Sequence, residues 1–577
     1  MGDVTLTIDG RQVTVPAGTS VLEAAGQAGV NIPTLCYLKD INVIGSCRMC
    51  VVEIEGARTL AASCVTPVAP NMVVHTNTKT VRDARRAVLE LIISNHPYEC
   101  LTCTRSGSCE LQSMAESMGI REIRFEGEKG QHPVDRSSPS IVRDPNKCIL
   151  CRRCISVCEN VQGVSAIGLA RRGFASVVSP AGELPLGEAI CTNCGQCVLV
   201  CPTGALTEVD STRTVWDALA DPKKHVVVQT APAIRVSLGE EFGLAPGSIV
   251  TGQMVAALRA LGFDRVFDTD FTADLTIIEE GNELLERIKH GGAMPMITSC
   301  SPGWIKFIEH FYPEMLPNLS TCKSPQQMFG ALAKTYYAEK AGIDPKDVFV
   351  VSIMPCTAKK FECERPEMRS SGYKDVDAVL TTRELARMLR ESGIDVSCLE
   401  PEDYDAPLGI STGAGVIFGA SGGVMEAALR TVYEVVTGKE LPSLDFEAVR
   451  GFEGIKEAQV DLAGTTVRVA VAHGLGNARK LLDRVRSGEA AYDFIEIMAC
   501  PGGCIGGGGQ PIGTNTERRL ERIAATYQAD RGMPMRKSHE NPAIKQLYEE
   551  FLKAPLGERS HELLHTHYVA RGKWKTV

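Results

Sequence analysis

The sequence lacks several features that would direct it to a membrane, to nucleic acid or to a nucleotide. No uninterrupted apolar run in its 577 residues approaches the length of about 20 residues that a membrane-spanning helix needs. The net charge of -9 argues against nucleic acid as the main partner. A Walker A motif is absent, and the pairs Gly413-x-Gly415 and Gly474-Leu475-Gly476 lack the rest of a dinucleotide fingerprint. We therefore expect a soluble protein that binds no nucleotide by itself.

The first residues also lack the basic stretch and the apolar core of a secretory signal, so none is predicted. Cysteine, by contrast, is abundant. Of 22 cysteines, 15 lie between residues 36 and 201, mostly at gaps of two, three or five residues. Disulfide scaffolds are short secreted domains, whereas these gaps are typical of iron–sulfur ligation and imply a reducing compartment. We predict a cytoplasmic protein whose residues 36–201 conduct electrons.

Two four-cysteine runs carry the most specific signal. They are Cys148-x2-Cys151-x2-Cys154-x3-Cys158 and Cys191-x2-Cys194-x2-Cys197-x3-Cys201. Zinc modules pair two Cys-x2-Cys units and do not show this order. It is the order of bacterial ferredoxins with two 4Fe–4S clusters, in which the fourth cysteine of each run ligates the other cluster. We therefore predict one cluster on Cys148, Cys151, Cys154 and Cys201, and a second on Cys158, Cys191, Cys194 and Cys197.

Upstream, four more cysteines follow a stretch with the pattern of a β-hairpin. Residues 4–15 alternate between apolar and polar side chains around a turn at Asp9-Gly10. The cysteines after it are Cys36, Cys47, Cys50 and Cys64. This arrangement resembles a β-grasp ferredoxin domain with a 2Fe–2S cluster, although the first gap is longer than in the plant type, and zinc is the alternative.

Between these groups lies the spacing His96-x3-Cys100-x2-Cys103-x5-Cys109. Apolar residues at helical spacing predict a helix over 81–93, which Pro97 ends directly after His96. From its position alone, His96 fits equally well as a ligand and as a partner of the helix C-terminus. Three cysteines leave one position of a 4Fe–4S cluster unfilled, and an imidazole there should raise the cluster potential.

Composition divides the chain into domains. The polar stretches 126–146 and 211–224 are predicted connectors. We predict a multidomain α+β and α/β protein with a 2Fe–2S ferredoxin-like domain (1–80), a histidine-ligated 4Fe–4S domain (81–125), a two-cluster ferredoxin domain (138–210) and a large α/β catalytic domain (211–577).

In the large domain, four apolar runs end at residues of chemical interest. They are residues 226–228, 294–297, 348–353 and 494–497, followed by Ala231-Pro232, Ser299-Cys300-Ser301, Met354-Pro355-Cys356 and Met498-Ala499-Cys500. Ligands of α/β sheets bind beyond the carboxyl ends of the strands, so we expect these segments to converge on one crevice. The lone thiols Cys322, Cys363 and Cys398 are instead predicted to be small buried hydrophobes.

These segments resemble the signature segments of the iron-only (FeFe) hydrogenases. The second signature, Met-Pro-Cys-x-x-Lys-x-x-Glu, stands here as Met354 to Glu362, and the third runs from Glu496 through Cys500 and Cys504 to Pro511. With the cysteine array in front, the resemblance covers the entire chain and reaches the clostridial type. The histidine–cysteine run is also similar to a site of respiratory NADH dehydrogenases. A zincin pattern, His561-Glu562-Leu563-Leu564-His565, lies in the hydrogenase-like tail and is treated as a coincidence.

The resemblance implies an H-cluster, which is a 4Fe–4S cube joined through a cysteine to a two-iron unit with CO, cyanide and azadithiolate. It implies that Cys504 is the bridging thiolate and that Cys356 and Cys500 hold the cube. Lys359 should donate a hydrogen bond to a cyanide, with Glu362 in the same segment. Met354, Met498, Ala231, Pro232 and Gln326 are expected in the pocket wall.

The family's proton path corresponds to Glu283, Ser320, Glu280 and Cys300. The first signature departs from the family, because its two adjacent cysteines are Cys300-Ser301 here. Either Cys300 holds the cube and Ser301 carries protons, or Ser301 is a weak cube ligand and Cys300 stays in the path. Because iron–sulfur clusters are held by thiolates, ligand chemistry slightly favours the first arrangement.

We therefore predict reversible H2 oxidation and proton reduction, with electrons passing through one 2Fe–2S and three 4Fe–4S accessory clusters. The expected partners are ferredoxin or flavin- and NAD(P)-binding subunits, as in electron-bifurcating complexes, together with maturation proteins. Two alternatives are a non-catalytic sensory or assembly protein, which Ser301 favours, and an electron-transfer subunit of an NADH dehydrogenase. The second alternative should lack the segments with Cys356, Cys500 and Cys504.

Overall fold

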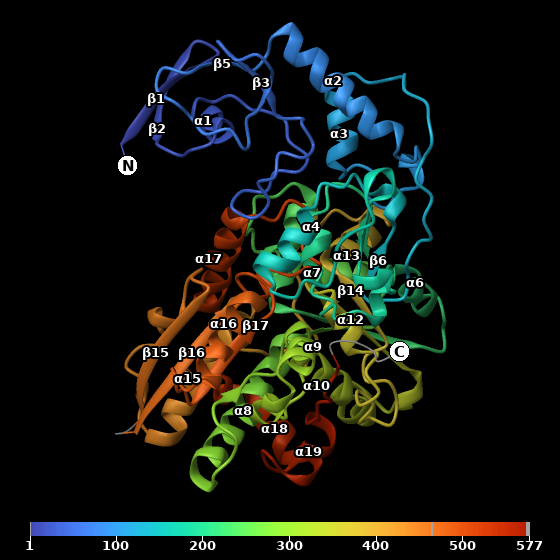
Figure 1. Ribbon diagram of the computed structural model, residues 1–577. Coiled ribbons are helices and arrows are strands. Elements are labelled where there is room, and N and C mark those ends of the chain that lie inside the picture. Colours follow the sequence, from blue (N-terminus) through green and yellow to red (C-terminus); the bar gives the residue numbers. More distant parts are fainter. Residues whose placement is uncertain (1, 463–464, 573–577) are drawn as a thin grey trace.

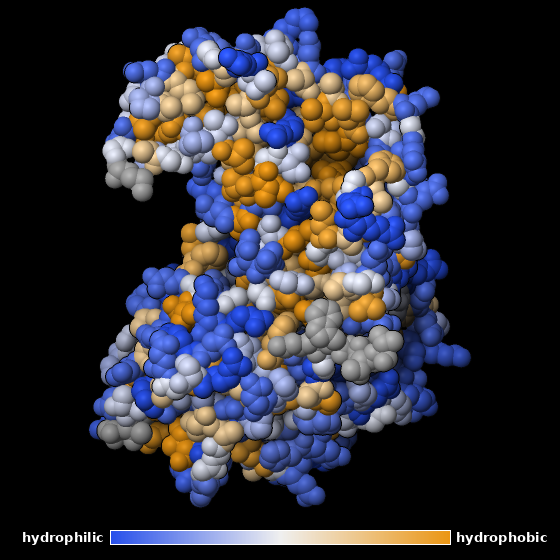
Figure 2. Space-filling model, viewed as in Figure 1, coloured by the Kyte–Doolittle hydropathy of each residue, from blue (hydrophilic) through white to orange (hydrophobic). Residues whose placement is uncertain are grey.

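A computed structural model describes residues 2–462 and 465–572 (Figure 1). The N-terminal part of the chain forms a lobe above the larger C-terminal part, and α2 and α3 lie beside it (Figure 1). In the face shown in Figure 2, apolar residues gather on the upper part of the molecule, whereas the lower part is mainly polar. Within the described residues, no helix combines the length and the apolar character needed to cross a membrane.

The N-terminal lobe is a five-stranded sheet in the order β2-β1-β5-β3-β4. The predicted hairpin is confirmed, since β1 pairs antiparallel with β2 and the turn residues Asp9 and Gly10 both have positive φ. A capping box of Ser20 and Glu23 begins α1. The elements are β1 (Asp3–Ile8), β2 (Arg11–Pro16), α1 (Val21–Gln27), β3 (Val51–Ile54), β4 (Ala61–Ala62) and β5 (Val73–His75).

The middle of the chain is mostly loop held by short elements. The predicted helix is α2 (Lys79–Ser94), which ends just before His96. The first predicted connector contains a strand at its end, because β6 (Ile141–Arg143) pairs with β9 (Leu206–Glu208). The second contains a helix, α6, whose Val215 and Ala218 are buried. The other elements are α3 (Glu110–Ser117), α4 (Arg153–Ser156), β7 (Gly168–Ala170), β8 (Val177–Ser179), α5 (Gln196–Val200) and α6 (Thr212–Leu219).

The large domain contains two four-stranded sheets. The first has the order β11-β10-β13-β14 and is parallel throughout; its strands are β10 (His225–Thr230), β11 (Arg265–Asp268), β13 (Val348–Met354) and β14 (Ala378–Thr381). The second has the order β12-β17-β16-β15, in which only β15 is antiparallel; its strands are β12 (Met296–Ile297), β15 (Ile455–Leu462), β16 (Thr465–His473) and β17 (Phe494–Met498). The four predicted apolar runs are therefore strands, two in each sheet.

Helices pack on and between these sheets (Figure 1). Cys322 and Cys363 are buried as predicted, but Cys398 is exposed because it lies in a single short turn on the surface, so that prediction was wrong. The helices of the large domain are α7 (Thr251–Ala260), α8 (Thr269–His290), α9 (Pro302–Phe311), α10 (Pro325–Leu332), α11 (Ala338–Ala341), α12 (Ala358–Glu362), α13 (Thr382–Glu391), α14 (Gly413–Val416), α15 (Gly423–Thr437), α16 (Leu475–Arg486), α17 (Thr516–Gly532), α18 (Pro542–Leu547) and α19 (Glu558–Leu564).

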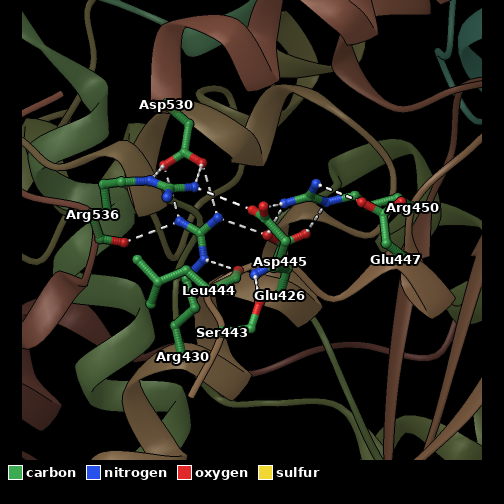
Figure 3. Close-up of polar contacts among 9 residues, drawn as sticks. All are labelled: Glu426, Arg430, Ser443, Leu444, Asp445, Glu447, Arg450, Asp530 and Arg536. Atoms are coloured by element: carbon green, nitrogen blue, oxygen red, sulfur yellow. Dashed lines mark hydrogen bonds and ion pairs between the residues drawn. The ribbon is translucent and has the colours of Figure 1, made fainter. Parts of the chain in front are cut away.

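A buried ion network joins α15 to α17 (Figure 3). Arg430 donates to Asp530 at 2.9 and 3.0 Å and to Glu426 at 2.6 Å, and the three side chains are completely buried. Arg450 also pairs with Glu426, and Arg536 also pairs with Asp530, so each of these carboxylates contacts two guanidinium groups. Buried charges have lost their hydration and are stable only beside opposite charges. The network therefore fixes the position of α17.

Replacing Arg430 with methionine should lower the free energy of unfolding by about 3 kcal/mol, since it leaves two buried carboxylates with one cation fewer. Urea unfolding of the full-length protein measures this loss. The control is Arg484→Met, which breaks the largely exposed pair with Glu457 and should cost less than about 1 kcal/mol. A similar small loss in both variants would contradict the role given to the network.

Candidate iron–sulfur sites and active site

The structure gathers the ferredoxin-type cysteines into two groups that cross the two sequence runs. One cavity is lined by three cysteines of the first run together with the last cysteine of the second run. These four are Cys148, Cys151, Cys154 and Cys201. The complementary four line another: Cys158, Cys191, Cys194 and Cys197. The exchange arises because α4 and α5 lie side by side, each carrying one cysteine of its run.

Both cavities suit a group that accepts thiolates. Backbone N–H groups point at sulfur, as from Leu150 to Cys148 (3.4 Å) and from Ala166 to Cys158 (3.3 Å). Burial raises the pKa of the Cys151 thiol to about 12, so ionised sulfur needs a nearby positive charge. Iron ions supply that charge. The donor sets therefore fit iron–sulfur clusters.

In the N-terminal lobe, the four cysteines form one compact group. The Sγ atoms of Cys50 and Cys64 are 3.3 Å apart, and the N–H of Cys47 lies 3.5 Å from Cys36 Sγ. Hydrogen bonds from their neighbours lower the pKa of Cys47 to about 5 and that of Cys50 to about 6. Thiols that share protons in this way are suited to binding a metal cluster.

The third predicted donor set is less closely grouped. Burial, with the charge of Lys147 as the next cause, lowers the pKa of His96 to about 4, and its Nδ1 is buried without a hydrogen-bond partner. A neutral imidazole with a free nitrogen fits a ligand. Cys109 Sγ lies 3.6 Å from the Pro202 carbonyl, whereas Cys100 is exposed. No hydrogen bond joins His96 to the three thiols in the described chain.

The four strand ends of the large domain meet at a single pocket, although they belong to two sheets. The predicted residues that line it are Ala231, Pro232, Cys300, Ser301, Gln326, Met354, Cys356, Lys359, Met498, Cys500 and Cys504. Its surface is almost entirely apolar. An enclosed apolar wall that carries three thiols fits a metal cofactor held by cysteine.

Lys359 is the fixed cation of the pocket. Its Nζ donates to Glu362 Oε2 at 3.0 Å and to the Cys300 carbonyl at 3.2 Å. Glu362 does not line the pocket; it lies behind the wall and also accepts from Gln326 Nε2 at 3.1 Å. It therefore holds Lys359 and Gln326 in position.

Sequence reasoning missed part of the wall. Thr269 and Phe418 also line the pocket, and neither follows a strand of the four runs. For Glu496 the sequence indicated membership of the third signature but no structural role. Its buried carboxylate accepts hydrogen bonds from the N–H groups of Gly422 and Met425 at 2.7 and 2.8 Å. It binds the first turn of α15 and thereby fixes β17, which leads to Cys500.

The ferredoxin-type loop packs against the segments that form the pocket. Gly195 and Gly508 are in such close contact that a Cβ on Gly508 would lie 2.6 Å from the Cα of Gly195. Thr357, next to Cys356, donates to the Asn193 carbonyl at 2.7 Å. Gln196 Nε2 donates to the Gly506 carbonyl at 2.8 Å. One cysteine cavity is therefore adjacent to the pocket.

A chain of polar groups leads from the pocket toward the surface. Ser320 donates to Glu283 Oε2 at 2.9 Å, and Ser299 Oγ donates to Glu280 at 3.3 Å. Burial, reinforced by the charge of Glu283, raises the pKa of Glu280 to about 7. Burial and then the charge of Glu280 raise the pKa of the Cys300 thiol, which lines the pocket. All four predicted path residues thus lie in one region.

Cys300 and Ser301 face different neighbours. Ser301 Oγ accepts a hydrogen bond from the N–H of Ala499 at 3.2 Å, directly beside Cys500. For Cys300, burial and then the charges of Glu280 and Cys504 raise the pKa of the thiol, which therefore lies in the electrostatic field of these two groups. The contacts therefore favour Ser301 on the side of Cys500 and Cys300 on the side of the acidic residues, opposite to the arrangement that ligand chemistry slightly favoured.

Comparison with known families agrees with this geometry. Residues 224–508 match the C-terminal domain of the iron-only hydrogenase large subunit, and 516–571 match the iron hydrogenase small subunit. Residues 2–79 match a 2Fe–2S cluster-binding domain, 85–124 the iron–sulfur region of NADH-ubiquinone oxidoreductase G, and 138–207 the ferredoxin-like domain of NADH-quinone oxidoreductase subunit 3. The chain belongs to the iron-only (FeFe) hydrogenases.

Two curated relatives are similar along nearly the entire chain. The NADP-reducing hydrogenase subunit HndD of Solidesulfovibrio fructosivorans is 55% identical over 99% of this chain and 100% of the relative. Iron hydrogenase 1 of Clostridium pasteurianum is 40% identical over 98% of this chain and 99% of the relative. A solved FeFe hydrogenase from Chlamydomonas reinhardtii is 47% identical, with a TM-score of 0.57 over 63% of this chain and 100% of that one.

These findings confirm the predicted family, the multidomain α/β fold class and the predicted activity. The protein is an oxidoreductase that acts on H2 and carries iron–sulfur domains of the 2Fe–2S and 4Fe–4S types. A subunit that only transfers electrons is not supported, because the catalytic segments with Cys356, Cys500 and Cys504 lie inside the hydrogenase match.

Proposed function

We propose that the chain binds one 2Fe–2S cluster, three 4Fe–4S clusters and an H-cluster, and that electrons pass along them in both directions. The observation that carries this proposal is the adjacency of the Cys158/Cys191/Cys194/Cys197 cavity to the pocket with Cys356, Cys500 and Cys504. His96, Cys100, Cys103 and Cys109 would hold the third 4Fe–4S cluster, and Cys36, Cys47, Cys50 and Cys64 the 2Fe–2S cluster. The free nitrogen of His96 supports its role.

In the pocket, Cys356, Cys500 and Cys504 would hold the H-cluster, with Ser301 Oγ in the fourth position at the cube. The bound H-cluster supplies the redox chemistry of H2. Lys359 provides a fixed positive charge for anionic diatomic ligands. Met354 and Met498, with the other apolar groups of the wall, exclude water and so strengthen that charge.

The proton path would run from the pocket through Cys300, Glu280 and Ser320 to Glu283. Glu283 lies at the outer end of this path and is 8% exposed, whereas Glu280 is 2% exposed. A carboxyl group with a pKa near the working pH both accepts and releases protons readily. Glu280 is therefore the central carrier of the path.

The electron acceptor would be a flavin- and NADP-binding partner subunit in the cytoplasm, with ferredoxin as the alternative carrier. A relative that spans the entire chain is a subunit of an NADP-reducing hydrogenase. The sequence carries no complete nucleotide fingerprint, so the nucleotide site would belong to the partner. Electron bifurcation would require such a complex, and loading of the H-cluster would require separate maturation proteins.

An assay of the isolated chain tests this division of labour. After anaerobic maturation, the chain under H2 should reduce an artificial viologen acceptor but not NADP+, because only the first acceptor can take electrons directly from a cluster. Acceptor reduction is followed by absorbance. Formation of NADPH by the isolated chain would contradict the proposed partner, and absence of viologen reduction with a complete H-cluster would contradict the proposed electron path.

A further inference from the structure

A second group of potential metal donors lies outside the pocket. The carboxylate of Glu283, the thiol of Cys322 and the imidazole of His565 each place one donor atom within 4.8 Å of the other two. The donors come from α8, from the loop before α10 and from the tail after α19. All three residues are nearly or completely buried, with 8%, 0% and 9% exposure.

The backbone explains why these residues meet. Cys322 and His565 form an isolated antiparallel β-bridge. Its hydrogen bonds run from the N–H of Lys323 to the Leu564 carbonyl (2.8 Å) and from the N–H of Thr566 to the Thr321 carbonyl (2.7 Å). Residues paired in this way carry their side chains next to each other. The thiol and the imidazole are thus held together by the fold.

His565 is already oriented as metal-binding histidines are. Its Nε2 lies 3.2 Å from the Glu279 carboxylate, and its Nδ1 lies 2.8 Å from Thr321 Oγ1. The same carboxylate also accepts hydrogen bonds from the hydroxyls of Tyr548 and Ser560 and from the N–H of Leu556, so it serves as an acceptor throughout. When Nε2 donates its hydrogen to a carboxylate, the lone pair of the ring lies on Nδ1 and can bind a metal. A histidine that binds zinc usually donates its other ring N–H to a carboxylate in this way.

We propose that Glu283, Cys322 and His565 form a binding site for Zn2+. A carboxylate, a thiolate and an imidazole are together the donor types that zinc binds, with water completing the tetrahedron. The metal would take the place of the Thr321 hydroxyl on His565 and release the proton of Cys322. The site belongs to neither the accessory clusters nor the pocket.

Zinc bound there would stop proton movement, because it would fix the charge and the lone pairs of Glu283. This consequence rests on the proton path proposed above, whereas the metal site itself does not. Since the metal displaces protons from its ligands, inhibition should weaken as the pH falls. Zinc would therefore act as an inhibitor that competes with protons and leaves the clusters intact.

Zinc titration of the matured holoenzyme tests both parts. Zn2+ should inhibit H2 uptake, a chelator should reverse the inhibition, and Cys322→Ala should raise the inhibitory zinc concentration at least about tenfold. Cys322→Ser, which keeps the shape of the site, is a second variant in case the alanine variant folds poorly. Cys398→Ala, which removes an exposed thiol, is the control and should behave like the wild type.

Equilibrium dialysis with metal analysis provides the direct measurement. The wild type should bind about one zinc per chain with no loss of iron, and Cys322→Ala should need at least about tenfold more free zinc to reach the same occupancy. Equal zinc binding in both proteins, or zinc uptake that only replaces cluster iron, would overturn the site. Zinc bound at Cys322 with normal turnover would leave the site standing and would overturn the assignment of Glu283 to the proton path.

Discussion

Glu280→Gln is expected to reduce H2 turnover by about a hundredfold or more, because proton transfer by a positioned side chain contributes that much to catalysis. The buried Glu280 lies between the Ser299–Ser320 hydroxyls and the Cys300 thiol. Glutamine has nearly the same shape but cannot pass on a proton. Steady-state H2 oxidation and evolution, measured with saturating artificial electron carriers, report the loss.

The pH dependence gives this prediction a definite sign. The pKa of Glu280 is raised from 4.5 to about 7, so the folded protein holds this proton more tightly than the unfolded chain does. Protonation therefore favours the folded state, and this contribution is lost as the pH rises from about 4.5 through 7. Glu280→Gln should remove both this dependence of stability and the transition near pH 7 in the turnover profile.

A matched control lies on the same helix. The side chain of Glu286 is 55% exposed and pairs with His290 at 3.4 Å on the surface, so Glu286→Gln should leave turnover unchanged. Iron content and the spectra of the reduced clusters should be the same in both variants. If Glu280→Gln kept more than about half of the activity with intact clusters, protons would have to reach the pocket by another path.

Cys356→Ser is expected to abolish activity and to lower the iron content by about four atoms per chain, because a 4Fe–4S cube needs thiolate ligands. In this chain the proposed cube has Ser301 in its fourth position, so losing Cys356 would leave it with two thiolates. Iron analysis of the protein expressed without the maturation system isolates this effect from the two-iron unit. Cys363→Ser, at a buried thiol outside the pocket, is the control.

The reciprocal change tests Ser301 itself. Ser301→Cys should slow the loss of cube iron to a chelator, since it places a sulfur beside Ala499 and Cys500, where Ser301 Oγ now accepts a hydrogen bond. Cys300→Ser should leave the iron content unchanged and affect only proton transfer. The opposite pattern, in which Cys300→Ser loses the cube and Ser301→Cys has no effect, would restore the arrangement in which Cys300 is the ligand.

Much of the site was predictable because its residues follow buried strands. The runs before Cys356 and Cys500 are β13 and β17, and their ends meet at the pocket as expected. The sequence did not indicate that the strands form two sheets, because β12 pairs with β17 across about 200 residues. Periodicity identifies a strand but not its distant neighbour.

Contacts made by isolated residues were the least predictable. Cys322 was expected to be a simple core residue, and only its β-bridge to His565, more than 240 residues away, brings it beside Glu283. The neighbours of Ser301 depend in the same way on how the loop before α9 meets the end of β17. Such pairs cannot be predicted from the local sequence, since they are formed only when distant segments pack together.

The contact between Gly195 and Gly508 affects how this enzyme can be re-engineered. A Cβ on Gly508 would collide with the Cys194 carbonyl and with Gly195, and a Cβ on Gly195 would collide with Thr357, so these packed segments can vary only together. The ferredoxin-type segment is therefore not an interchangeable module, since its last loop packs against the segments that carry the residues of the active-site wall. A chimera with a foreign electron-input domain would have to inherit this glycine pair as one unit.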